Sequence, residues 1–189
     1  VGKGVAQMLA QLPNAVAKAA YPQIAGLPAQ EAAAFTAQMV RQNLMLLVPA
    51  ACILAAVAPL LLPALYGEAY AASSGPVLFL LGATVLQSVG IVVSRFFNGT
   101  NDQRPNILTR LVAVSVNLLL NSIWIPTHGI IGAAAALLVS YSLDAGLIVG
   151  VFLVRNRMGL GEFILPRRSD FDPYRQLVAQ LRRADASMT

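Results

Sequence analysis

The chain has 189 residues, of which 57% are hydrophobic and only 11% are charged, with a net charge of +5. Soluble domains are roughly half apolar and about a quarter charged, so this composition, with a mean hydropathy of +0.68, argues against a soluble enzyme, a disordered chain and a nucleic-acid-binding domain. One cysteine, Cys52, and one histidine, His128, exclude a disulfide framework and a Cys/His zinc site. The composition therefore predicts an integral membrane protein. Because the chain starts at Val1 without a signal-peptide pattern, we expect a fragment without its N-terminal part.

Long apolar segments define the predicted elements. A bilayer core about 30 Å thick needs roughly 20 apolar residues in a helix. A Pro/Gly-containing stretch at 125–129 divides the longest uncharged run in two, because these residues interrupt helices. The sequence predicts an all-α integral membrane helix bundle over 1–154, followed by a basic tail over 155–189. The five predicted spans are 4–24, 43–66, 76–97, 107–126 and 130–154.

The positive charges predict the orientation of these spans. Under this span assignment, 11 of the 13 Lys and Arg residues fall on one side: Arg41, Arg95, Arg104, Arg110, Arg155, Arg157, Arg167, Arg168, Arg175, Arg182 and Arg183. Lys and Arg collect on cytoplasmic loops. We therefore expect a multi-pass protein of the cell inner (cytoplasmic) membrane, in contact with membrane lipids, with its C-terminus in the cytoplasm.

The tail has one further pattern. Residues 172–184 begin with Asp172 and Pro173 and continue with apolar residues at helical spacing beside several arginines. This pattern is typical of a short amphipathic helix on the inner leaflet, although a disordered tail is an open alternative.

A polar stripe marks the first predicted span. Its members, at steps of 4, 4, 3 and 4 residues, share one helical face: Lys3, Gln7, Gln11, Asn14 and Lys18. Such a stripe either hydrogen-bonds to neighbouring helices or lines a water-filled cavity. Since lysine in a span is costly, we interpret Gln7, Gln11, Asn14 and Lys18 as lining a substrate cavity.

Three further charged residues are candidates for function. Asp144 lies mid-span, where a carboxylate either forms a structural ion pair, with Lys18 as the most plausible partner, or relays protons or cations. Arg95 and Arg110 lie at the cytoplasmic ends of their spans, where arginine side chains commonly reach out to the interface. The alternative is a cationic vestibule for a phosphate-bearing substrate.

Motifs for nucleotide binding, metalloprotease chemistry and serine-hydrolase chemistry do not occur in the sequence. We therefore expect no enzyme activity, no cofactor and no bound metal.

Four sequence segments resemble those of the polysaccharide-biosynthesis or oligosaccharide flippases, a branch of the multidrug/oligosaccharidyl-lipid/polysaccharide exporter superfamily. They are LPNA at 12–15 with YPQIA at 21–25, LPALYGEAY at 62–70, NGTN at 98–101 with Arg104-Pro105, and IP at 125–126 with GIIGAA at 129–134 and Ser140-Tyr141. Each motif alone has low specificity for the family, but the four occur in the family's order along nearly the whole region of predicted spans.

The resemblance implies five helices of a six-helix C-terminal lobe, whose N-terminal lobe lies in a missing part of the same chain. It also implies transport of an oligosaccharide on a polyprenyl pyrophosphate by alternating access, for cell-surface polysaccharide or lipopolysaccharide assembly. By position, Lys18 is the best candidate for holding the pyrophosphate, followed by Arg95 and Arg110. Two other functions stay open, a cation-coupled multidrug exporter of the same superfamily and a non-transporting membrane scaffold.

Overall fold

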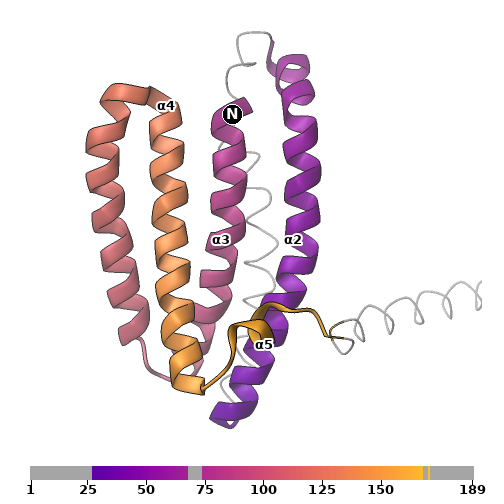
Figure 1. Cartoon of the computed structure of the whole chain (residues 1–189), viewed down its shortest axis with the longest axis vertical. Helices are drawn as coiled ribbons and strands as arrows, with labels where there is room; N and C mark the ends of the chain where they lie inside the picture. The colour runs from indigo at the N-terminus through magenta and orange to yellow at the C-terminus, as the bar shows by residue number, and fades with distance from the viewer. Residues whose placement is uncertain (1–26, 68–73, 168–169, 171–189) are drawn as a thin grey trace, which may run out of the picture.

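The computed structural model describes residues 27–67, 74–167 and 170 (Figure 1). These residues form helices and, among themselves, no strand: α2 (Ala29–Tyr66), α3 (Ser74–Gly99), α4 (Arg104–Asn156) and α5 (Leu160–Ile164). By length and composition, α2, α3 and α4 are each able to cross a membrane. The prediction of an all-helical chain is thus confirmed for the described residues. The predicted span 4–24 and the predicted tail helix 172–184 lie outside them.

Helix α4 is a hairpin of two arms. Its 53 residues are interrupted at Gly129, which has φ 57° and ψ −131°, and the arms run side by side in Figure 1. Only glycine adopts such a backbone conformation readily. The turn is also tight, because a Cβ atom on Gly132 would lie 2.3 Å from the carbonyl oxygen of Trp124. The predicted spans 107–126 and 130–154 lie within the two arms.

Helix α2 begins earlier than predicted. The sequence places a loop before the span at 43–66, but the structure is helical from Ala29 onward. Polar residues such as Glu31 and Arg41 lower the hydropathy of this segment and hide it from a search for apolar runs. The segment nevertheless has a buried face at helical spacing: Ala32, Ala33, Thr36, Ala37 and Val40.

The largest buried cluster lies where α2, α3, α5 and the second arm of α4 meet. Its centre is aromatic, with the rings of Phe96 and Phe152 edge to face at a centroid distance of 4.9 Å. Phe163 of α5 packs on Phe152 at 5.5 Å and is 1% exposed. Closer to the middle of α3, this helix approaches the second arm of α4 closely, since a Cβ on Gly90 would lie 3.6 Å from the Cα of Ala145. Small residues at such contacts allow close helix packing in membranes.

The segment after α4 folds back onto α2. Asp170 accepts hydrogen bonds from Nε and Nη2 of Arg41 at 2.6 and 3.0 Å, and both side chains are almost fully buried. Arg41 also donates to the carbonyl of Glu162 at 2.9 Å. Helix α5 and Asp170, which the sequence assigns to the tail, therefore contact α2.

Candidate functional site

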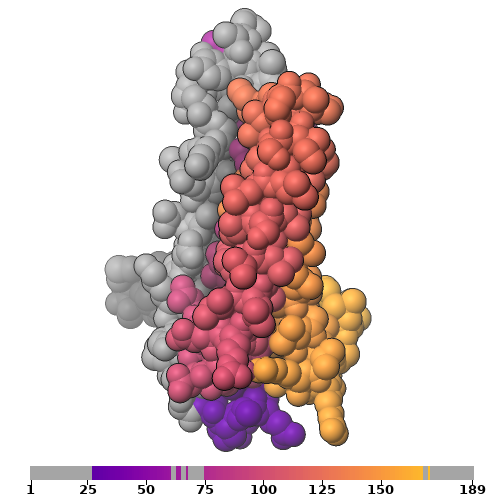
Figure 2. Space-filling view, turned by 90° about the vertical axis from the view of Figure 1, so that its left-hand side faces the viewer, coloured from indigo at the N-terminus to yellow at the C-terminus, as the bar shows by residue number. Residues whose placement is uncertain are grey.

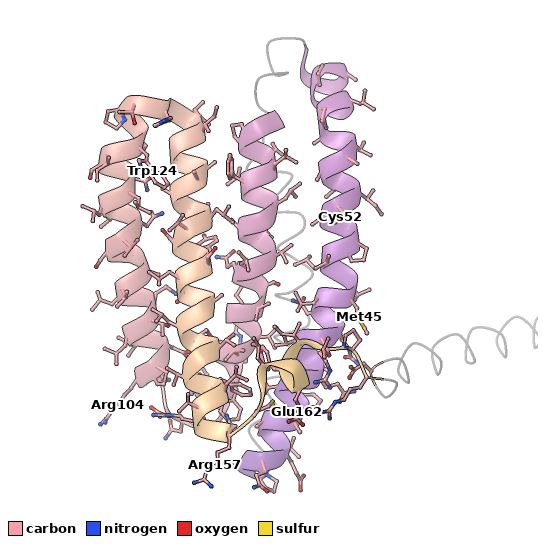
Figure 3. The ribbon with its side chains drawn as sticks, viewed as in Figure 1. Met45, Cys52, Arg104, Trp124, Arg157 and Glu162 are labelled. Atoms are coloured by element: carbon pink, nitrogen blue, oxygen red, sulfur yellow. The ribbon has the colours of Figure 1, made fainter. Side chains whose placement is uncertain are left out.

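The described arginines gather at one end of the bundle, where α3 ends and α4 both begins and ends. Arg104 and Arg157 mark this end in Figure 3. The described cationic residues are Arg41, Arg95, Arg104, Arg110, Arg155, Arg157 and Arg167. Farther along the helices, 43–67, 74–94 and 111–154 contain no Lys or Arg, and their one acidic residue is Asp144. The bundle thus has a basic end and a long apolar body.

An open cavity of about 640 Å³ lies at this basic end, between α3 and the first arm of α4. The sequence proposes Arg95 and Arg110 as a cationic vestibule, and both residues line this one cavity. The other polar lining residues are Ser94, Asn98, Gln103 and Asn106. Arginine and amide donors around one space are the groups that bind phosphate oxygens.

Asn106 organises the wall of the cavity. Its Nδ2 donates to the carbonyl of Ser94 at 3.1 Å and to Oδ1 of Asn98 at 2.8 Å, which ties α4 to α3. Its own Oδ1 is buried without a hydrogen-bond partner among the described residues. Sequence reasoning missed Asn106, although it precedes Arg110 by four residues and therefore shares its helical face.

Asp144 contacts Arg110 across the α4 hairpin. The distance from Arg110 Nη1 to Asp144 Oδ2 is 3.3 Å, and the side chains are 48% and 9% exposed, respectively. Both residues line a second cavity, of about 230 Å³, between the two arms. The sequence favoured Lys18 as the partner of Asp144. Lys18 lies outside the described residues, and the partner within them is Arg110. The proton-relay role of Asp144 stays a prediction.

Amides and hydroxyls continue this polar seam between the arms. Asn117 donates to Oγ of Ser140 at 3.0 Å, and Asn121 donates to Oδ1 of Asn117 at 2.9 Å. The outer surface of the first arm is by contrast apolar. It faces the viewer in Figure 2, and its exposed side chains include Leu111 and Leu118. The hairpin therefore has a polar inner seam and an apolar outer face suited to lipid.

Two other ion pairs fasten the basic end. Arg155 forms a salt bridge with Asp102 in the α3–α4 connection, and this hydrogen bond lowers the pKa of the Asp102 carboxyl. The hydrogen bonds from Arg41 likewise lower the pKa of Asp170, against the opposing effect of burial. Both carboxylates are acceptors for guanidinium groups outside the apolar body, so they hold the base of the bundle together.

The predicted cavity residues of the first span lie outside the described residues: Gln7, Gln11, Asn14 and Lys18. The structure therefore brings together Arg95, Arg110 and Asp144 from the predicted set. Within the described ranges, no group of three His, Cys, Asp or Glu side chains is placed to hold a metal ion.

Comparison with known proteins gives one distant relative. Over 140 residues the chain is 27% identical to the probable low-salt glycan biosynthesis flippase Agl15 of Haloferax volcanii. The match covers 71% of this chain but only 29% of the relative. No protein-family model matches the chain, and no solved structure matches it. The relative is named as a transporter rather than an enzyme, which agrees with the prediction of no enzyme activity.

Proposed function

We propose that the chain forms part of a flippase that moves a lipid-linked oligosaccharide across the cytoplasmic membrane for the assembly of cell-surface polysaccharide. The distant similarity to a glycan biosynthesis flippase supports this class of transporter. The observation that carries the proposal is the cavity lined by both Arg95 and Arg110 at one end of three apolar helices.

The proposed substrate has a pyrophosphate group between a polyprenyl chain and a sugar chain. Arg95 and Arg110 would bind the phosphate oxygens, with Asn98 and Gln103 as further donors, because guanidinium groups pair with phosphate through two parallel hydrogen bonds. The apolar outer face of the first arm would lie beside the polyprenyl chain. Each part of the substrate thus meets a surface of matching chemistry.

The basic end would face the cytoplasm under the positive-inside rule. The cavity would then receive the headgroup from the side where lipid-linked sugars are assembled, and alternating access would release it on the opposite side. In the intact protein, we propose that Gln7, Gln11, Asn14 and Lys18 extend the polar path.

Complementation tests this function. The intact protein would be expressed in a strain that lacks its oligosaccharide flippase, and surface polysaccharide would be measured alongside the membrane level of each variant. Arg95→Gln and Arg110→Gln should each reduce surface polysaccharide by roughly tenfold, the value of one charge-assisted hydrogen bond.

Two arginines at the same end of the bundle provide matched controls. Arg104 and Arg157 are exposed and do not line the cavity. Arg104→Gln and Arg157→Gln should therefore leave surface polysaccharide unchanged. If all four variants behave alike, the cavity is not where the headgroup binds.

A further inference from the structure

Arg110 belongs to both cavities of the basic end. With Arg95 it lines the open cavity of about 640 Å³. With Asp144 it lines the cavity of about 230 Å³ between the arms of α4. One guanidinium group therefore stands between a buried carboxylate and the space proposed for the substrate's anionic group.

The contact between Arg110 and Asp144 is loose. It consists of one distance of 3.3 Å, and Arg110 is 48% exposed. Arg41, by contrast, is 5% exposed and donates twice to Asp170 and once to a backbone carbonyl. Since a guanidinium group has five N–H donors in a fixed fork, Arg110 has donors that can turn toward the larger cavity.

An anion in the larger cavity would compete with Asp144 for this guanidinium. Among the described residues, the charged and titratable groups that line the smaller cavity with Asp144 are Arg110 from the first arm and Tyr141 from its own arm, and Arg95 of α3 lines the larger cavity with Arg110. Asp144 is almost fully buried, so the loss of Arg110 would leave its charge without a partner, which is costly.

We propose that Asp144 is a positioning residue that competes with a bound phosphate group for Arg110, so that the anion must weaken the Arg110–Asp144 pair to engage this guanidinium fully. This inference rests on the proposed function, because it requires that an anionic group binds beside Arg95 and Arg110. Its consequence is that Asp144 weakens binding and promotes release, because the ion pair re-forms as the anion leaves.

The test is a double-mutant cycle on the intact protein in detergent, with inorganic pyrophosphate as the probe and titration calorimetry as the measurement. Asp144→Asn should tighten pyrophosphate binding by roughly two- to fivefold, the coupling of a partly exposed charge pair. In an Arg110→Gln background the same substitution should change nothing. Asp144→Glu should keep the wild-type affinity, because it retains the competing charge.

Glu162→Gln is the matched charge control, since Glu162 also pairs with an arginine, Arg167, at 2.9 Å. It should leave the affinity unchanged. A monodisperse size-exclusion profile establishes folding, and Asp144→Ser replaces Asp144→Asn if the latter aggregates. If Asp144 has only a structural role, Asp144→Asn and Asp144→Glu should both bind pyrophosphate more weakly than the wild type, which would overturn the proposal.

The proposed anion site and the proposed competition for Arg110 can be refuted separately. If Arg95→Gln and Arg110→Gln leave pyrophosphate binding unchanged, the anion site itself is wrong. If both weaken binding but Asp144→Asn does not strengthen it, or strengthens it equally without Arg110, the competition is wrong and the site stands.

Discussion

The buried ion pair between Arg41 and Asp170 should dominate the stability of the basic end. Asp170→Asn keeps the shape of the side chain but leaves the guanidinium of Arg41, which is 5% exposed, without a counter-charge. Two hydrogen bonds to a charged group, at 2.6 and 3.0 Å, are weakened at the same time. Breaking a buried pair in this way costs about 3–5 kcal/mol.

Thermal unfolding of the purified protein in detergent measures this effect. A loss of that size should lower Tm by roughly 10 °C for a protein of this length. Glu162→Gln is the control, because it breaks an ion pair whose side chains are about half exposed. Exposed pairs contribute about 0.2–1 kcal/mol, so the control should unfold within a few degrees of the wild type. Equal Tm values for the two variants would refute the argument from burial.

The pH dependence follows from the lowered pKa of Asp170. Arg41 holds the carboxyl ionised below its ordinary pKa of 3.8. A carboxyl with a lowered folded-state pKa stabilises the protein above its unfolded-state value, and this contribution disappears as the pH falls through the folded-state value. The Tm difference between wild type and Asp170→Asn should therefore stay constant at neutral pH and shrink only below about 3.8.

Two further substitutions test the α4 hairpin by the same unfolding assay. Gly132→Ala should destabilise the protein by about 1–3 kcal/mol, the cost of overpacking, because the new Cβ would lie 2.3 Å from the Trp124 carbonyl oxygen. Gly146→Ala is the control and should be neutral, because a Cβ at this position has no neighbour within 4 Å. Equal effects of the two substitutions would contradict the tight turn. Asn117→Leu should lower the free energy of unfolding by about 0.6 kcal/mol, because it removes one interhelical hydrogen bond. A much larger loss would show that Asn117 stabilises the hairpin through more than this hydrogen bond.

Much of the helical fold could be predicted from the sequence because membrane helices need long apolar runs. The runs at 43–66 and 76–97 lie within α2 and α3, and the Pro/Gly stretch at 125–129 contains the break in α4. The early start of α2 could not be predicted this way, because its first turns bury small residues against α3 and α5 while exposing polar ones. Amphipathic periodicity, rather than mean hydropathy, is the signal that applies there.

The candidate site was predictable only in part. Arg95 and Arg110 stand out because they are charges at the ends of apolar spans. Their shared cavity depends on how α3 and α4 pack, which the spacing of 15 residues between them does not give. The pairing of Arg110 with Asp144 depends on the register of the two arms, which the turn at Gly129 sets. The Arg41–Asp170 pair joins residues 129 apart, and no local pattern reveals such a contact.

The most direct test of the central claim is the water accessibility of the cavity in the intact protein. Single cysteines at Ser94 and Asn98, which line the cavity, would be compared with cysteines at Val112 and Leu118 on the exposed apolar side of α4, all in a Cys52→Ser background. A membrane-impermeant maleimide should label positions 94 and 98 but not 112 and 118, and inorganic pyrophosphate should slow the labelling. Equal labelling at all four positions, or labelling at 94 and 98 that pyrophosphate leaves unchanged, would contradict a water-filled anion site between α3 and α4.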